Sequence, residues 1–436
     1  MKAFAPYPVY LETLVRKLTS GPTSELKDLV DAALDGQASQ ELRRLVPLQA
    51  LRLAGAFFTG STLSQGATKL LLGDTPSDMS VLDPACGAGD LLLAYSRHLP
   101  AERTWKQTVE CWNNSVFGLD LQPHFVRAAR LRLAIAAWQA THQLTGLDPG
   151  PAPSMSDLFP GVRVGSGFEP SIEFESLEQI LLNPPFTHSI APNACKWASG
   201  RTSTAALFLA NCLEKARKGA RLVAILPDVL RSGSRYKRFR QYVESRATIR
   251  EVRIFGRFDS RTDVDVFLLL LQVHEDSKGS LEATTAWQMA SKDDSTVGDH
   301  FKISVGPVVE FRDPHAGAWR PFARPKDLPP WQSIYLLPSK RRYSGRLIKP
   351  PFVTIRRTSS TSDKWRATAN IVSRSTPVAV ENHLLVAQPH DGTLRSCKAL
   401  LEVLKTGATN RRLNERIRCR HLTVEAVRLL PWVEGS

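Results

Sequence analysis

The residues best suited to chemistry in this sequence are Asn183-Pro184-Pro185-Phe186, which end an apolar stretch at residues 179–182. Two consecutive prolines fix the backbone and remove its N–H donors. The side-chain amide of Asn183 and the carbonyl of Pro184 then offer acceptors at fixed positions beside the ring of Phe186. An Asn-Pro sequence can also serve only as a turn, but a fixed acceptor pair with an adjacent ring suits a flat ligand that carries an amine.

A second group of residues could bind a ligand at the ends of two earlier strands. Asp83 ends an apolar stretch and is followed by Gly87 and Gly89, and glycines in such a turn let the backbone approach a ligand closely. This pattern alone is weak, because a tight strand-to-helix connection needs glycine whether or not anything binds. Asp120 ends the next apolar stretch, where a carboxylate can accept hydrogen bonds from both hydroxyls of a ribose. A helix cap or a solvated strand end is the competing interpretation of Asp120.

These residues need a sheet that brings strand ends together. From about Gly55 to His274, short apolar segments alternate with longer helical ones, which predicts an α/β fold of parallel strands with crossover helices. The predicted strands are residues 80–83, 116–120, 179–183 and 221–226, with a closing hairpin at 249–255 and 264–273. The predicted helices are residues 90–99, 124–143 and 204–218. We therefore expect the carboxyl ends of the strands to form the site.

Two or three domains are expected in a chain of this length, and the pattern along the chain indicates three. Residues 1–54 show helical spacing of leucine and valine and are predicted to form a helical N-terminal segment. Residues 55–275 form the α/β domain. The alternation stops at a polar stretch after His274, so residues 276–436 are predicted to form a separate α+β domain, with strands at 352–355 and 383–386 and a helix at 397–406.

Positive charge is concentrated in two places, residues 231–261 and this last region. The net charge of the chain is +15, and residues 311–375 contain 14 basic and 3 acidic residues. Tryptophans and tyrosines lie among these charges, and cations beside aromatic rings suit phosphates and bases together; they are Trp319, Trp331, Tyr335, Tyr343 and Trp365. Charge of this kind can also serve solubility alone, but we favour nucleic acid as the partner. The residues expected to bind it are Lys340, Arg341, Arg342, Arg346, Arg356 and Arg357.

Other features narrow the class of protein. No apolar run approaches the ~20 residues that a membrane span requires, and the first ten residues lack the apolar core of a secretory signal, which favours a cytoplasmic location. The six cysteines are widely scattered, so neither a metal site nor a disulfide framework is expected. There is no Pro-Cys pair of the kind that cytosine C5 methylation uses.

From about Gly55 to Val273 the motifs resemble, in order, those of the N6-adenine DNA methyltransferases of restriction-modification systems, in the gamma class of amino-methyltransferases. The resemblance implies a Rossmann-like methyltransferase sheet, S-adenosylmethionine as cofactor, double-stranded DNA as partner and a C-terminal target-recognition domain. It also implies that Asn183-Pro184-Pro185-Phe186 is the catalytic tetrapeptide. The residues that it implies for the cofactor are Thr59, Asp83, Ala85, Gly87, Gly89, Asp120, Leu121, Asp157 and Leu158.

Two details of the resemblance concern individual positions. The motif Phe57-Phe58-Thr59-Gly60 departs from the family, which often has proline where Gly60 stands. Phe258 occupies the place of an aromatic residue that, with Phe186, stacks on a flipped target base. Because polar residues 259–263 follow it, we expect the Phe258 ring to lie on a solvent-facing loop.

Alternative functions remain open at this point. An RNA or protein-amide methyltransferase could use the same tetrapeptide, and a catalytically silent DNA-binding component could keep the fold and the charge. A dehydrogenase is a weaker alternative, because the loop contains only two of the three fingerprint glycines. The sequence contains no convincing nuclease motif, so any cognate restriction endonuclease is expected on a separate chain.

Overall fold

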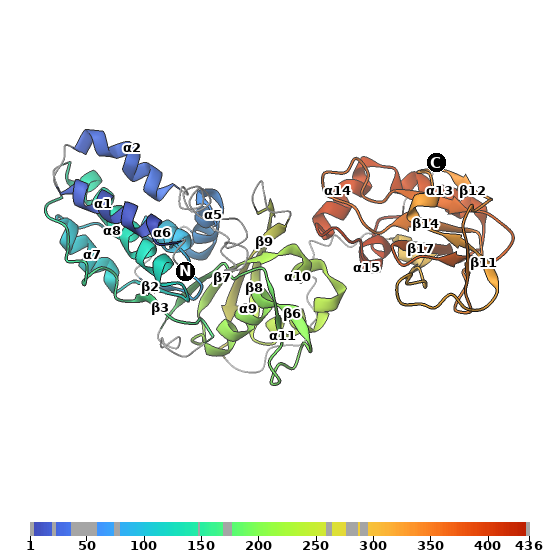
Figure 1. Cartoon of the computed structure of the whole chain (residues 1–436), viewed down its shortest axis with the longest axis horizontal. Coiled ribbons are helices and arrows are strands. Elements are labelled where there is room, and N and C mark those ends of the chain that lie inside the picture. The colour runs from blue at the N-terminus through green and yellow to red at the C-terminus, as the bar shows by residue number, and fades with distance from the viewer. Residues whose placement is uncertain are drawn as a thin grey trace. The chain divides into compact units, whose positions relative to one another are not determined.

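The computed structural model describes residues 4–19, 23–35, 59–73, 79–146, 149–168, 177–258, 264–275, 287 and 295–432. The chain divides into two compact units (Figure 1). The first contains Met1–Pro227 and Arg238–Ala283, and the second contains Asp228–Lys237 and Thr284–Ser436.

A mixed sheet forms the centre of the first unit. Among the described residues its strand order is β3-β2-β1-β4-β7-β9-β8; the first five strands are parallel, and β9 runs antiparallel to both of its neighbours, β7 and β8. The strands are β1 (Val81–Asp83), β2 (Val116–Asp120), β3 (Val162–Val164), β4 (Gln179–Leu182), β7 (Arg221–Pro227), β8 (Ala247–Arg257) and β9 (Asp265–Val273). Because the order reverses between β1 and β4, their carboxyl ends flank the crevice where α/β sheets of this kind bind ligands.

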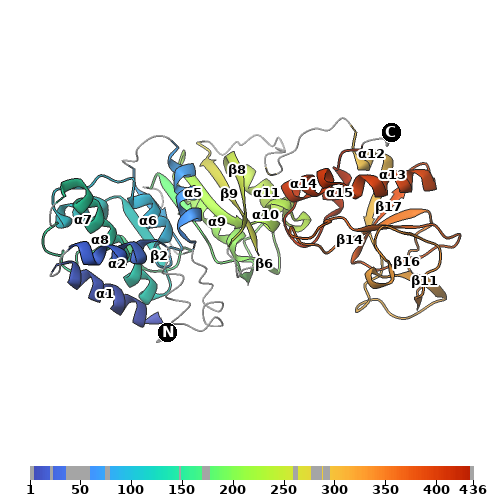
Figure 2. The ribbon, with the colours of Figure 1, turned by 90° about the horizontal axis from the view of Figure 1, so that it is seen from above.

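Helices cover this sheet and one another. Helix α6 packs on β1 and contacts both α5 and α8, whereas α9 packs on β7. Helices α1 and α2 lie along α8 and belong to the same unit (Figure 2). The helices of this unit are α1 (Pro6–Leu18), α2 (Thr23–Leu34), α5 (Ser61–Leu72), α6 (Asp90–Ser96), α7 (Trp105–Asn113), α8 (Pro123–Thr145), α9 (Thr204–Lys215) and most of α11 (Lys237–Glu244). A hairpin of β5 (His188–Ile190) and β6 (Arg201–Ser203) follows β4.

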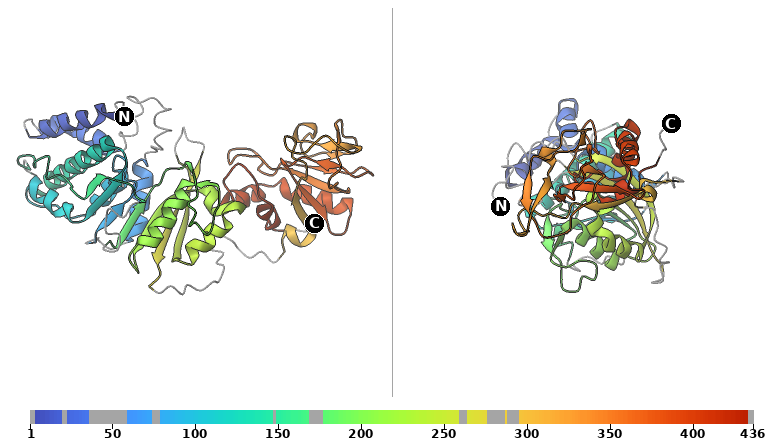
Figure 3. Two further views of the ribbon diagram at one scale, coloured as in Figure 1. Left: turned by 60° about the horizontal axis from the view of Figure 1, so that its bottom comes forward. Right: turned by 90° about the vertical axis from the view of Figure 1, so that its right-hand side faces the viewer.

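The second unit is built on a five-stranded sheet, in the order β10-β17-β14-β15-β12, and a three-stranded sheet, in the order β13-β11-β16. C-terminal helices, red in Figure 3, pack on this larger sheet. Alternate residues of the sheet face two cores: Val353 and Ile355 pack with the C-terminal helices, whereas Phe352 packs with residues of the smaller sheet. The strands are β10 (Phe301–Val305), β11 (Trp319–Ala323), β12 (Ser333–Ile334), β13 (Lys340–Arg342), β14 (Phe352–Arg356), β15 (Ala369–Val372), β16 (Ala379–Val380) and β17 (Leu384–Pro389). The helices are α10 (Asp228–Ser232), α12 (Val297–His300), α13 (Leu394–Leu404), α14 (Gly407–Arg416) and α15 (Val424–Arg428).

Helix α10 belongs to the second unit although it directly follows β7 in sequence. Asp228 pairs with Arg231 at 2.7 Å, and both side chains are buried. The second carboxylate oxygen of Asp228 accepts the backbone N–H of Arg418 at 2.9 Å. These contacts attach α10 to the C-terminal part of the chain.

The α/β fold expected from the sequence is confirmed, and each predicted strand and helix of the sheet region lies within a few residues of an observed one. The predicted hairpin is the antiparallel pair β8–β9. β3 was not predicted, because Val162-Arg163-Val164 is short and two of its three residues are exposed. Phe57, Phe58 and the polar residues 259–263 lie outside the described residues. No described helix has the length and apolar character needed to cross a membrane.

Candidate active site

Strand ends β1, β2 and β4 and the segment after β3 surround one cavity of about 360 Å³, which we call the strand-end cavity. The side chains from the first three strand ends are Asp83, Asp120 and Asn183. Thr59, Ala85, Gly87 and Leu121 also line it, as the sequence led us to expect. Asp90 lines it too, as do Leu91, Thr204 and Phe208, which no sequence motif indicated.

The turn after β1 depends on its glycines. Gly87 has φ +51° and Gly89 has φ +88°, a backbone region that other residues rarely adopt. A Cβ atom on Gly89 would lie 3.0 Å from the Cβ of Ala129, so α8 could not approach the turn as closely. Gly89 therefore positions the turn and the start of α6.

Asp83 is a buried carboxylate, and Asp120 is a half-buried one. Burial raises the pKa of Asp83 to about 8, although a hydrogen bond from the backbone N–H of Ala85 acts to lower that pKa. The charges of Asp120 and Asp90 raise it further. Burial also raises the pKa of Asp120, although its carboxylate accepts the N–H groups of Gln122 at 2.8 Å and Gly87 at 3.0 Å. Because an adjacent positive charge stabilises the ionised form of both carboxyls, this pair favours a ligand that carries positive charge.

Asn183 follows β4 and is held by a side chain from the segment before α5. Its Nδ2 donates to Thr59 Oγ1 at 2.8 Å. Pro184 is buried and Pro185 lines the strand-end cavity. The segment that follows is fixed by hydroxyl contacts of Thr204, at the start of α9, with Thr187 at 3.0 Å and Ser189 at 2.7 Å. The amide of the predicted tetrapeptide therefore enters the same cavity as the two carboxylates.

Comparison with known proteins assigns the family. A family model described as N-6 DNA Methylase matches residues 47–282, more than half of the 436 residues. The chain belongs to the N-6 DNA methylase family. No curated protein matches it in sequence.

Solved structures resemble this N-6 DNA methylase at low sequence identity. The type IIL restriction-modification enzyme MmeI, in complex with DNA, has a TM-score of 0.50 and 11% identity over 93% of this chain and 67% of its own. A modification subunit of a putative type I restriction enzyme from Vibrio vulnificus YJ016 has a TM-score of 0.42 and 18% identity over 58% of this chain. The match covers only 50% of that Vibrio chain. The likeness to MmeI concerns the fold alone.

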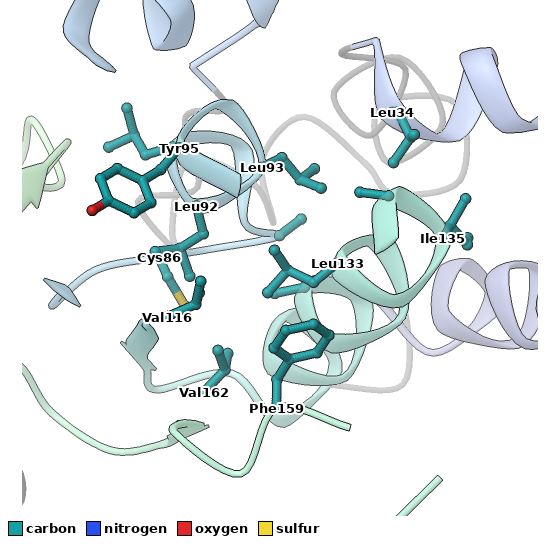
Figure 4. Packing of buried hydrophobic residues seen from close by; sticks show 14 of the residues in the cluster. Leu34, Cys86, Leu92, Leu93, Tyr95, Val116, Leu133, Ile135, Phe159 and Val162 are labelled. Carbon is teal, nitrogen blue, oxygen red and sulfur yellow. The ribbon is translucent and has the colours of Figure 1, made fainter. Parts of the chain in front are cut away.

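One part of the expected cofactor site is placed differently in this methylase. Asp157 and Leu158 precede β3 and are not among the described residues that line the strand-end cavity. Leu158 is buried, and the buried ring of Phe159 points toward Leu133 of α8 (Figure 4). The assignment of Asp157 and Leu158 to the cofactor's adenine therefore does not agree with the fold, because strand-end ligands meet the carboxyl end of β3 and these residues lie at its amino end.

Residues 165–168, after β3, line the cavity instead. Gly167 lies so close to the β1 turn that a Cβ atom would be 2.4 Å from the carbonyl oxygen of Pro84. Phe168 is 41% exposed, and its ring centroid lies 4.2 Å from that of Phe208. The assignment of Asp157 and Leu158 came from the resemblance alone, and β3 was not among the predicted strands, so the residues that follow it were not considered.

The expected position of Phe258 is also corrected. Its side chain is only 6% exposed and joins the hydrophobic core of the first unit, so the prediction of a solvent-facing ring is wrong. The ring packs edge-on against Phe186, with centroids 5.3 Å apart and an interplanar angle of 77°. Phe258 therefore supports the half-buried ring of Phe186.

The basic residues of the second unit fall into two groups. Lys340, Arg342 and Arg346 are exposed. Arg341 is 3% exposed and donates to the carbonyl oxygen of Asp313, so its expected place on a DNA-binding surface is wrong. Arg356 and Arg357 are half-buried and donate to backbone carbonyls of Leu328 and Asn382, respectively. Clustered charge in the sequence did not distinguish cations that anchor loops from cations that face solvent.

Proposed function

We propose that this chain transfers a methyl group from S-adenosylmethionine to the exocyclic N6 amine of adenine in DNA. The observation that carries the proposal is that Asn183, Asp83 and Asp120 line one cavity at the point where the strand order reverses. A carboxylate pair that suits a cationic nucleoside thus lies beside an amide that suits an amine.

The residues of the strand-end cavity fit S-adenosylmethionine, which supplies a reactive methyl group on a sulfonium ion when bound. Asp83 suits the ligand's positive charge, since it is buried among other carboxylates. Each oxygen of Asp120 accepts one backbone N–H and has lone-pair capacity for a ribose hydroxyl. Residues 165–168, together with Phe208, would hold the adenine end in place of Asp157 and Leu158.

Asn183 and Pro184 would activate the target amine. The lone pair of an adenine amine is delocalised into the ring, so the nitrogen is a poor nucleophile. Acceptance of its two hydrogens by Asn183 Oδ1 and the Pro184 carbonyl favours a tetrahedral nitrogen whose lone pair can attack the methyl group. Phe186 would stack on the base once it leaves the duplex, which offsets the few kcal/mol, in order of magnitude, that base flipping costs.

Residues 276–436 would form the target-recognition domain, residues 55–275 the catalytic domain and residues 1–54 its helical extension. One surface of the second unit favours DNA: Trp319 lies opposite Arg342, and Pro321 opposite Lys340, on paired strands β11 and β13. We call these four residues the β11–β13 face. Trp319 is 67% exposed, whereas Phe322 and Tyr343, on the other side, are buried. A ring beside two cations suits a DNA backbone and its bases.

The proposed biological setting is a restriction-modification or related defence system, in which a separately encoded restriction endonuclease is the partner. This methylase would then protect the recognition sequence that the nuclease cleaves.

The test is methyl transfer from radiolabelled S-adenosylmethionine to equal amounts of duplex DNA, RNA and total protein, followed by nucleoside analysis. Label in N6-methyladenine from DNA is the expected result. Modified-base sequencing of DNA from cells with and without the gene then identifies the methylated sequence. Label found only in RNA or protein would overturn the proposal, and Asn183→Ala serves as the inactive control.

A further inference from the structure

Arg132 is a fully buried arginine in the middle of α8, within the hydrophobic core of the first unit. Its Nε donates to the carbonyl oxygen of Ala33 in α2 at 2.9 Å. Its Nη1 donates to the carbonyl oxygen of Ala88 in the β1 turn at 2.6 Å and to Asp90 Oδ1 at 2.7 Å. A buried guanidinium is costly unless such partners surround it, so these three partners fix its position closely.

The contacts continue from Asp90 to the catalytic amide. Asp90 Oδ2 accepts the backbone N–H of Thr59 at 3.1 Å. Thr59 Oγ1 in turn accepts from Asn183 Nδ2 at 2.8 Å. Asp90 and Thr59 are each 8% exposed, so water has little access to this part of the chain of contacts. An unbroken series of hydrogen bonds therefore runs from Ala33 through Arg132, Asp90 and Thr59 to Asn183.

We infer that Arg132, Asp90 and Thr59 are positioning residues that fix the orientation of the Asn183 amide, and that α2 is thereby part of the methyl-transfer machinery. The inference rests on the proposed role of Asn183. Rotation of an asparagine amide about χ2 is broad and roughly two-fold, so an amide without a fixed partner divides its time between orientations. A hydrogen bond from Nδ2 to a fixed hydroxyl selects one orientation before the substrate binds, which lowers the cost of reaching the transition state.

Other contacts between the N-terminal helices and the rest of the unit provide matched controls. Gln139 Nε2 donates to Asp31 Oδ1 at 3.0 Å, which joins α8 to α2. Arg127 pairs with Glu12, which joins α8 to α1. Neither contact touches the strand-end cavity or the Asp90–Thr59 segment. Loss of either contact loosens helix docking without breaking the series that leads to Asn183.

The first measurement compares single-turnover methylation with cofactor affinity in Thr59→Val, Thr59→Ser, Asp90→Asn, Arg132→Lys, Gln139→Ala and Arg127→Gln. We expect Thr59→Val, which replaces the hydroxyl by a methyl group of similar size, to slow methyl transfer about tenfold or more. Its dissociation constant for S-adenosylmethionine should change by less than about threefold, because one hydroxyl interaction rather than the shape of the cavity is lost. Thr59→Ser should recover most of the rate. Asp90→Asn and Arg132→Lys should also be slow, whereas Gln139→Ala and Arg127→Gln should match the wild type.

A second measurement does not depend on activity. In protein labelled with [¹⁵N]asparagine, the side-chain signal that disappears in Asn183→Ala identifies the Asn183 amide. Its protons should exchange more slowly with water in the wild type and Thr59→Ser than in Thr59→Val or Asp90→Asn. If Arg132→Lys does not fold, Thr59→Val and Asp90→Asn still test whether the series of hydrogen bonds positions the Asn183 amide.

The outcomes separate this inference from the proposed function. If Asn183→Ala still methylates adenine, the proposed function of the tetrapeptide fails, and the positioning role fails with it. If Asn183→Ala is inactive but Thr59→Val has the wild-type rate and amide exchange, only the positioning role is overturned. It is also overturned if Gln139→Ala and Arg127→Gln slow transfer as much as Asp90→Asn, because helix docking alone then explains the effect.

Discussion

The amide nitrogen of Asn183 donates to the hydroxyl of Thr59 at 2.8 Å, across 124 positions of sequence. Thr59 precedes α5, whereas Asn183 follows β4, so the contact joins two parts of the first unit at the strand-end cavity. With Nδ2 directed to Thr59, the carbonyl oxygen occupies the other end of the amide. That arrangement matches an amide whose oxygen accepts a hydrogen bond from an amine.

Asn183→Ala should retain cofactor and DNA binding but lose methyl transfer by about 100-fold or more, because its acceptor acts mainly as positive charge develops on the amine. Calorimetry, DNA binding and single-turnover kinetics on the same preparation separate these steps. Equal losses in cofactor affinity and in rate would instead assign Asn183 to cofactor binding.

Cofactor affinity should depend on the proton held by Asp83. Because the pKa of Asp83 is about 8 in the chain without a ligand, a cationic ligand that needs the carboxylate must displace a proton below that pH. The association constant for S-adenosylmethionine should rise by up to about tenfold per pH unit from pH 6 to 8 and then level off. Calorimetry in buffers of different ionisation enthalpy should detect about one released proton at pH 7. In Asp83→Asn both effects should disappear.

The same pKa shift predicts the pH dependence of folding. A carboxyl with a raised pKa holds its proton in the folded state, so its contribution to stability is complete below the ordinary value of 3.8 and is lost as pH rises to about 8. Urea unfolding of the ligand-free chain should therefore show Asp83→Asn gaining stability relative to the wild type as the pH increases from 5 to 8. A constant difference between the two proteins over that range would contradict the raised pKa.

Much of the fold and site could be predicted because regular patterns repeat. Parallel strands buried on both faces appear as apolar runs, and a parallel sheet brings their carboxyl ends to one edge. Asp83, Asp120 and Asn183 end or follow such runs, so their convergence followed from the strands alone.

Predictions were wrong or missing where tertiary contacts, rather than local sequence patterns, determine the position of a residue. β3 is too short and too exposed to give an apolar run, so nothing in the sequence corrected the assignment of Asp157 and Leu158 that the resemblance implied. Phe258 follows a half-exposed strand and precedes polar residues, yet packing against Phe186 buries it. The link from Arg132 to Asp90 spans 42 positions and has no sequence signature.

Because the Phe258 ring is buried, Phe258→Ala should mainly lower the stability of the folded chain. Truncating a buried phenylalanine typically costs about 3–5 kcal/mol, so the melting temperature should fall clearly. Phe258→Leu should recover most of that stability. If Phe258→Leu is stable but methylates a normal duplex poorly and a mismatched target well, the aromatic face itself contributes to base flipping. If Phe258→Leu has normal activity on both substrates, the role of Phe258 is packing alone.

The two kinds of basic residue in the second unit should respond differently to substitution. Trp319→Ala and Arg342→Ala alter the exposed β11–β13 face, so they should weaken DNA binding by about 1–3 kcal/mol each at low salt without lowering the melting temperature. Arg342→Ala should also reduce the salt dependence of binding by roughly one phosphate contact.

Arg341→Met is the matched control on the adjacent position. Because Arg341 is buried against Asp313 and His315, its loss should lower the melting temperature. At a temperature where Arg341→Met is folded, the salt dependence of its DNA binding should equal that of the wild type. If Arg341→Met reduces the salt dependence of DNA binding and Arg342→Ala does not, the DNA-binding surface lies elsewhere.

The last prediction tests the placement of the adenine end after β3. Gly167 packs so closely that a Cβ atom would lie 2.4 Å from Pro84 O and 2.8 Å from the ring of Phe208. Gly167→Ala should therefore push the segment after β3 away from the β1 turn and weaken S-adenosylmethionine binding by about tenfold or more, since complementary contacts would be lost on two sides of the cavity. Asp120→Ala should weaken binding as well, whereas Asp157→Ala should leave it within about twofold, because it removes no side chain from the cavity.

Gly66→Ala is the control for inserting a methyl group into this unit. Gly66 lies inside α5, and a Cβ atom there would make an ordinary contact of 3.9 Å with Leu268. In a helix interior, alanine is favoured over glycine by roughly 0.5–1 kcal/mol, so this variant should melt at a slightly higher temperature and bind the cofactor normally. If Gly167→Ala binds S-adenosylmethionine as well as Gly66→Ala, and Asp157→Ala binds it poorly, the adenine lies on the amino-terminal side of β3 and the sequence-based assignment was correct.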